Sequence, residues 1–168
     1  MSKNLTIGSK HFDLSRAIVM GILNVTPDSF SDGGRFDRVE QAVEHALRMK
    51  AEGADIIDIG GESTRPGAQA VSEEDELERV IPVIRAIRQQ SDIPVSIDTS
   101  KAAVMRAAAD EGADMINDVN ALQAQGTVET CAELVLPVCL MHMQGEPRTM
   151  QQDPQYVDVV KDVIVFLQ

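Results

Sequence analysis

The sequence predicts an α/β protein built around a parallel sheet. Short apolar runs alternate along the chain with longer segments of helical periodicity, which is the order expected of βαβ units. The first run, residues 17–23, does not alternate polar with apolar residues, as is typical of a strand buried on both faces. Residues 52–58 (EGADIID) recur as residues 111–117 (EGADMIN), which indicates that one βα unit is repeated and places Asp58 and Asn117 at equivalent strand ends.

Each element has a local signal in the sequence. Residues 5–14 are expected to form a small hairpin that turns near residues 8–10 and could close the N-terminal end of the sheet. Ser72, followed by three acidic residues, is an expected helix N-cap, and Thr99 or Ser100 is expected to cap the next helix. Strands are predicted at 17–23, 55–59, 94–98, 115–118 and 137–142, and helices at about 39–47, 72–87, 99–109 and 128–135, with a last helical pattern at 157–167.

Two polar loops follow the first two strands of the sheet. Residues 23–34 change abruptly from apolar to polar and contain Phe30 among aspartates and hydroxyl residues, which favours a loop that closes over an aromatic, charged substrate. Residues 60–68 are rich in glycine, and they include the hydroxyl of Thr64 and the guanidinium of Arg65, which suits phosphate or carboxylate oxygens. The Gly-Lys-Ser/Thr ending of a P-loop is missing here. Both loops therefore predict binding of a small anionic molecule.

Four motifs in this order resemble the dihydropteroate synthases of folate biosynthesis: residues 20–34, 60–68, 96–101 and 116–118. The similarity covers the chain from about residue 5 to residue 167. It implies a (β/α)8 TIM barrel whose chemistry lies at the C-terminal ends of the strands. Because the sequence provides about five parallel strands and an N-terminal hairpin, we expect residues 1–168 to form a single pterin-binding barrel domain that is incomplete at its C-terminus.

The resemblance also implies a reaction, in which the amine of 4-aminobenzoate is alkylated by 6-hydroxymethyl-7,8-dihydropterin diphosphate and pyrophosphate leaves. Asp98 and Asn117 would read the donor and acceptor edge of the pterin, Met141 would contact its face, and Asn24 would give Mg²⁺ one oxygen ligand. Arg65 and Asp32 are the expected catalytic residues. Arg65 would hold the diphosphate or the closed loop together with Thr64, and Asp32 would stabilise a cationic pterin intermediate or a metal-bound water. The aminobenzoate pocket would be formed by Thr26, Pro27, Ser29, Phe30 and Pro66.

Structural alternatives remain open for three of these residues. Asp98 could be a helix N-cap, Asn24 a turn-forming asparagine before Thr-Pro, and Met141 a filler of the core. The sequence leaves the orientation of Asp58, Asp118 and His142 undecided. The alternative function is a noncatalytic pterin-binding or assembly fragment, since the family places further pterin and diphosphate contacts after residue 168. We therefore expect this chain alone to be inactive.

Composition limits the partners. A formal charge of −12 opposes binding to phosphate backbones, and 3% aromatic residues provide few stacking platforms, so nucleic acid is not an expected partner. The absence of an 18-residue apolar run argues against membrane insertion, and no apolar stretch follows a basic N-terminus, which argues against secretion. Cys131 and Cys139 are expected to be reduced, buried core residues of a cytoplasmic protein. The resemblance implies that the full-length form is a homodimer.

Overall fold

The chain opens with a two-stranded antiparallel hairpin. The computed structural model describes residues 4–26, 35–63, 70–146 and 149–168. Strand β1 (Asn4–Ile7) pairs with β2 (Lys10–Asp13), and the turn places Gly8 at φ +57°, where a side chain would be strained. The hairpin and its turn are therefore where the sequence predicted them.

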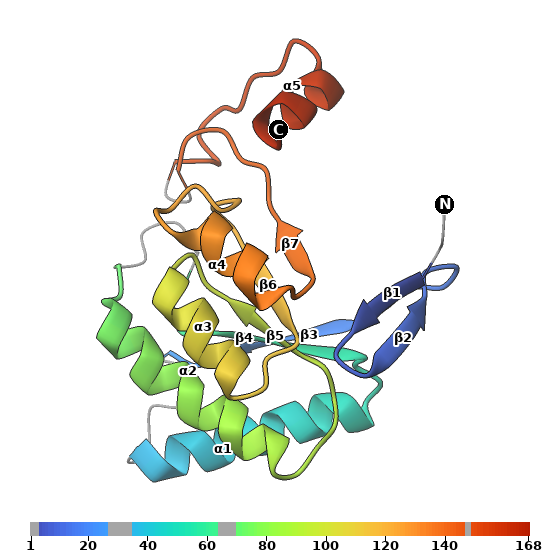
Figure 1. Ribbon diagram of the computed structural model, residues 1–168, viewed down its shortest axis with the longest axis vertical. Coiled ribbons are helices and arrows are strands. Elements are labelled where there is room, and N and C mark those ends of the chain that lie inside the picture. The colour runs from blue at the N-terminus through green and yellow to red at the C-terminus, as the bar shows by residue number, and fades with distance from the viewer. Residues whose placement is uncertain (1–3, 27–34, 64–69, 147–148) are drawn as a thin grey trace.

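A five-stranded parallel sheet forms the centre of the molecule, with its strands in sequence order. The strands are β3 (Met20–Asn24), β4 (Ile56–Gly60), β5 (Val95–Asp98), β6 (Met115–Asp118) and β7 (Val138–Leu140). The helices are α1 (Arg35–Ala51), α2 (Glu73–Arg88), α3 (Ala102–Asp110), α4 (Thr127–Leu134) and α5 (Val159–Phe166). Figure 1 shows α1 to α4 side by side along one face of the sheet, and α5 apart from them beyond β7. This regular alternation of parallel strands with helices confirms the predicted barrel-type α/β fold, here with five strands.

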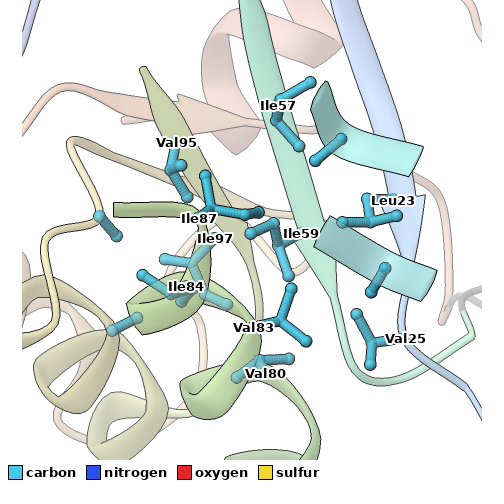
Figure 2. Packing of buried hydrophobic residues seen from close by; sticks show 14 of the residues in the cluster. Leu23, Val25, Ile57, Ile59, Val80, Val83, Ile84, Ile87, Val95 and Ile97 are labelled. Atoms are coloured by element: carbon cyan, nitrogen blue, oxygen red, sulfur yellow. The ribbon is translucent and has the colours of Figure 1, made fainter. Parts of the chain in front are cut away.

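The face of the sheet that meets the helices is apolar and fully buried. Leu23, Ile59 and Ile97 occupy equivalent positions on three neighbouring strands and are no more than 1% exposed. Figure 2 shows Ile59 and Ile97 beside the residues that project from α2 toward the sheet, Val80, Val83, Ile84 and Ile87. In the sequence, Val80, Ile84 and Ile87 recur at helical spacing, as expected of the inner face of this helix, and Val83 adds to that face in the structure. Burial of this face leaves the opposite face of the same strands for the site.

The opposite face is apolar only near the N-terminal ends of the strands. There, Ile7 and Phe12 of the hairpin pack with Ile56 of β4 and Met115 of β6 in a second, smaller cluster. The hairpin thus covers this end of the sheet, as the sequence analysis suggested. On this face, Asp58 and Ser96 share the row of Met115, and Asp98 and Asn117 lie further along the strands, toward their C-terminal ends.

One predicted helix cap is confirmed and the other is wrong. The side chain of Ser72 accepts a hydrogen bond from the backbone N–H of Asp75 at 3.1 Å, which caps α2. Helix α3, however, begins after Lys101, whose side chain makes no capping bond. Thr99 Oγ1 instead accepts from the Lys101 N–H at 3.2 Å, and the Ser100 hydroxyl bonds to Asp118. The two hydroxyls therefore organise the loop before the helix rather than its first turn.

The two cysteines differ in their surroundings. Cys131 is buried in the main core, whereas Cys139 is exposed on β7, so the expectation that both are core residues was wrong for Cys139. It was wrong because Val138, the neighbour of Cys139 along the strand, takes the side of β7 that packs against the core. No helix in the described residues is both long and apolar enough to cross a bilayer.

Candidate functional site

A row of polar and small residues crosses the sheet at the C-terminal ends of its strands. The register aligns Asn24 of β3 with Gly60, Gly60 with Asp98, Asp98 with Asn117, and Asn117 with Cys139. Residues aligned in this way point to the same face of a parallel sheet. The structure therefore brings together three residues that the sequence placed at separate strand ends, Asn24, Asp98 and Asn117.

Gly60 leaves open space between two of these side chains. A Cβ atom at this position would lie 3.6 Å from Asp98 Oδ2 and 3.8 Å from Asn24 Oδ1. Both oxygens therefore face the same region above Gly60, and a side chain there would occupy it. A glycine in the middle of a functional row permits close approach of a ligand.

Asp98 is the one acidic residue of the row. Within the described residues no hydrogen bond reaches it, although it is largely buried. Burial, and then the negative charges of Asp58, Glu76, Asp118 and Glu62, raise the pKa of Asp98 to about 7. A carboxyl group that lacks a protein partner and titrates near neutrality is typical of a ligand-binding or catalytic position. This geometry disagrees with the alternative of Asp98 as an N-cap, since α3 begins four residues later.

Asp58 lies one layer deeper on the same face. It aligns with Ile22 and Ser96, two residues before the end of β4, and is 4% exposed. Asn117 Nδ2 donates a hydrogen bond of 3.0 Å to Asp58 Oδ2. Burial raises the pKa of Asp58, and Ser96 and Asn117 only partly offset this. The repeat in the sequence had made Asp58 equivalent to Asn117, and this was wrong, because β4 continues to Gly60 and it is Gly60 that shares the row of Asn117.

Asp118 points to the opposite side of the sheet and has a structural role. Its side chain is fully buried and accepts three hydrogen bonds, from the Ser100 hydroxyl at 2.5 Å and from the backbone N–H groups of Asn120 and Leu122 at 2.8 Å. These bonds hold the segment after β6 against the segment after β5. Of the two aspartates that the sequence left undecided, Asp58 therefore faces the site and Asp118 holds the loops.

A half-buried lysine beside the row was not singled out in the sequence. Lys101 Nζ lies 2.5 Å from Glu62 Oε2 and 2.5 Å from Glu76 Oε2, and Glu76 is 1% exposed. Burial lowers the pKa of Lys101, but the two carboxylates raise it further, so its pKa lies above the ordinary value. Glu62 and Lys101 belong to two of the motifs in the sequence, which is the signal that could have found them.

A cavity of about 590 Å³ opens next to this ion pair. Its walls come from the segments after β4, β5, β6 and β7, and they include Asp98, Lys101, Asn120, Gln123 and Met143. The cavity touches the polar row only at Asp98. It is large enough for a small bicyclic ligand, because binding sites for such ligands span about 300 to 1,000 Å³.

The remaining predicted site residues are placed as follows. Thr26 lies two residues past Asn24 and is half-buried. Met141 follows β7, is half-buried, and donates its backbone N–H to Asp118 O at 3.2 Å, while Met143 rather than Met141 lines the cavity. The ring of His142 lies 4.7 Å from that of Phe166 and 5.7 Å from that of Tyr156. Seven predicted residues lie outside the described part of the chain: Pro27, Ser29, Phe30, Asp32, Thr64, Arg65 and Pro66.

In the described residues, the oxygen atom of Asn24 suits a metal ion that takes most of its other ligands from a bound substrate and water. No group of three or more His, Cys, Asp or Glu residues that could hold an ion is found within those residues. Asn24, at the tip of β3, contributes one amide oxygen that faces the space above Gly60. Mg²⁺ commonly takes one or two protein oxygens and completes its shell with phosphate oxygens and water. Asn24 therefore fits a single-ligand role.

Parallel strands with polar groups at their C-terminal ends define a protein of the barrel class with a small-molecule site at that edge. Comparison with known proteins gives the family. Residues 20–168 match the pterin binding enzyme family, and the chain belongs to it. It is 56% identical over 164 residues to the dihydropteroate synthase of Haemophilus influenzae, a match that covers 98% of this chain and 60% of the relative.

Solved structures agree with this assignment. The dihydropteroate synthase of Yersinia pestis in complex with a sulfonamide drug aligns with a TM-score of 0.89 and 56% identity, over 98% of this chain and 60% of that one. That of Xanthomonas albilineans with 4-aminobenzoic acid aligns with a TM-score of 0.85 and 54% identity, over 99% and 58%. The chain thus spans about 60% of the length of the relatives that it matches.

Proposed function

We propose that residues 1–168 form the pterin-binding portion of a dihydropteroate synthase, which joins 4-aminobenzoate to 6-hydroxymethyl-7,8-dihydropterin diphosphate and releases pyrophosphate. The observation that carries the proposal is the pair of Asp98 and Asn117. They adjoin on neighbouring strands, and in the described residues the Asp98 carboxylate lacks a hydrogen-bond partner. The Yersinia pestis relative is in complex with a sulfonamide drug, and Xanthomonas albilineans relatives are in complex with 4-aminobenzoic acid or 7,8-dihydropteroate, which agrees with this reaction.

A pterin suits this pair for a physical reason. Its ring carries N–H donors and a carbonyl acceptor along one edge, and a partly buried carboxylate beside an amide offers complementary groups. An analogue that lacks these donors would leave Asp98 and Asn117 unpaired, which costs about 1 to 3 kcal/mol per buried group and more for a charged one. Such a site rejects mismatched rings strongly.

The roles of the other residues follow from the resemblance. Asn24 would bind Mg²⁺, which when bound would neutralise charge on the departing pyrophosphate. Thr64 and Arg65 would hold the diphosphate, and Asp32 would stabilise a cationic pterin. Thr26, Pro27, Ser29, Phe30 and Pro66 would surround the aminobenzoate, and Met141 would contact the pterin face. In the reaction, the carbon–oxygen bond to pyrophosphate breaks and leaves the cationic pterin; the amine nitrogen then forms a bond to its methylene carbon and loses a proton to solvent.

Titration calorimetry with 6-hydroxymethyl-7,8-dihydropterin tests the binding role. We expect Asp98→Asn and Asn117→Ala each to weaken binding roughly 5-fold to 150-fold, the equivalent of about 1 to 3 kcal/mol. Asp110→Asn, on the exposed end of α3, is the matched control and should bind like the wild type. If both site variants bind the pterin with unchanged affinity, these residues do not form the pocket.

An activity assay tests whether this chain catalyses the reaction by itself. Residues 1–168 are incubated with the dihydropterin diphosphate, 4-aminobenzoate and Mg²⁺, and dihydropteroate is measured. Pterin binding without turnover is the result expected of this portion alone, whereas turnover would rule out the noncatalytic fragment. Homodimer formation and a cytoplasmic location also belong to the proposal, and light scattering and cell fractionation test them.

A further inference from the structure

Asp58 has no role in the pterin site proposed above, yet its carboxylate accepts a hydrogen bond from the side chain of Asn117. Its side chain is 4% exposed and lies on the inner face of β4, one layer below the row of Asn24, Asp98 and Asn117. Asn117 comes from β6, two strands away and 59 residues later in the sequence, and its amide nitrogen lies 3.0 Å from Asp58 Oδ2. The bond therefore spans β5 across the inner side of the sheet.

This bond gives the Asn117 amide a direction. The amide has two ends, a nitrogen that donates and an oxygen that accepts. Turning it over would set its oxygen against the carboxylate, acceptor against acceptor, and would leave a buried charge without its donor. The second oxygen of Asp58 already lacks a hydrogen-bond partner among the described residues, so losing the Asn117 bond would leave the carboxylate with no amide donor.

We propose that Asp58 is a positioning residue, which fixes Asn117 in one amide orientation and so decides the order of acceptor and donor that Asn117 presents to a ligand. The inference rests on the proposed pterin site and adds a determinant of its specificity. Asn117 Oδ1 then faces away from Asp58 and requires an N–H group on the ligand, in addition to the donor that Asp98 requires. A ring with an unprotonated nitrogen or a carbonyl at that position would be rejected.

The surroundings of Asp58 support a role in orientation. Acidic groups near this face come from several elements: Asp98 from β5, Glu62 after β4, and Glu76 from α2. The positive charge of Lys101 is already paired with Glu62 and Glu76. Asn117 Nδ2 donates the one amide hydrogen bond that Asp58 accepts among the described residues, and the Ser96 hydroxyl, aligned with Asp58 on β5, also lowers its pKa. Asp58 and Asn117 thus depend on each other.

A double-mutant cycle tests the proposal at pH 8.0. Asp58→Leu keeps the approximate volume and removes the acceptor, and we expect it to weaken binding of 6-hydroxymethyl-7,8-dihydropterin roughly fivefold to twentyfold. In an Asn117→Ala background the same change should have no further effect, because the residue through which Asp58 acts is gone. Losses that add in the double variant would overturn the proposal. Asp110→Asn, on the exposed end of α3, is the control and should bind within twofold of wild type.

A second measurement does not depend on ligand or on the stability of the leucine variant. In ¹⁵N NMR spectra of the free protein, the two side-chain N–H signals of Asn117 should be widely separated, with one protected from exchange. In Asp58→Asn, which keeps the shape but can also donate to the Asn117 oxygen, the separation and protection should fall. Unchanged signals in this variant would contradict the proposal. If instead the wild type shows the orientation but binds no pterin, the proposed function fails and the role of Asp58 stands.

Discussion

Replacing Asp98 by asparagine should make the protein more stable than the wild type at alkaline pH, although it weakens pterin binding. The pKa of Asp98 is raised to about 7 in the folded protein, chiefly by burial and then by the charge of Asp58. The unfolded chain loses the same proton near its ordinary value of 3.8. Between these values the folded state holds a proton that the unfolded state has lost, so this stabilisation is complete below pH 3.8 and is lost as pH rises through 7.

The magnitude follows from the pKa difference. Each pH unit between the two pKa values changes the free energy of unfolding by about 1.4 kcal/mol. From pH 5.5 to pH 8.0 the wild type should therefore lose about 2 kcal/mol relative to the variant, as an upper limit, since part of the carboxylate remains in water. Asparagine does not titrate, so this contribution is missing from Asp98→Asn.

Urea denaturation at the two pH values measures the effect. Other groups titrate in the same range, so the free energy of unfolding of the wild type is compared with that of the variant at each pH. The informative quantity is the change in this difference between pH 5.5 and pH 8.0. Asp110→Asn, on an exposed surface, is the control and should show no such difference. A difference for Asp98→Asn that is the same at both pH values would refute the assigned burial and charge environment of Asp98.

Three further changes test other parts of the structure. Ser72→Ala should destabilise the protein by about 1 kcal/mol because it removes the α2 cap, whereas Ser72→Asp should restore it; equal urea midpoints for all three proteins would contradict the cap. Gly60→Ala should leave stability nearly unchanged, since the added Cβ has contacts of 3.5 Å or more. It should weaken pterin binding in calorimetry because the methyl group lies between Asn24 and Asp98, and undiminished affinity would show that no ligand occupies this space. Arg88→Met should lower the free energy of unfolding by about 2 to 4 kcal/mol in thermal or urea denaturation. The change removes hydrogen bonds to Gly112 O at 2.7 Å and Ile93 O at 2.5 Å and leaves Asp114 without its ion pair. A loss below about 0.5 kcal/mol would argue against this network.

Local sequence patterns determined the elements and the edge of the sheet that carries the site. Continuous apolar runs predicted strands buried in a parallel sheet, and the helical spacing of Val80, Ile84 and Ile87 predicted the face of α2 that packs on it. The polar residue that ends each run placed Asp98 and Asn117 at strand ends. These features depend on neighbours within a few residues, so a single sequence contains them.

Only the tertiary structure decided what these side chains contact. Alternation along a strand puts Asn117 and Asp118 on opposite faces, but the sequence does not say which face meets the helices. The repeat suggested that Asp58 and Asn117 are equivalent, whereas β4 runs two residues further and places Asp58 a layer deeper, within reach of the Asn117 amide. Lys101 pairs with Glu62 and Glu76, which lie 39 and 25 residues away in the sequence. Register across the sheet and the packing of α2 on it bring these groups together, and both are set by the whole chain rather than by any local pattern.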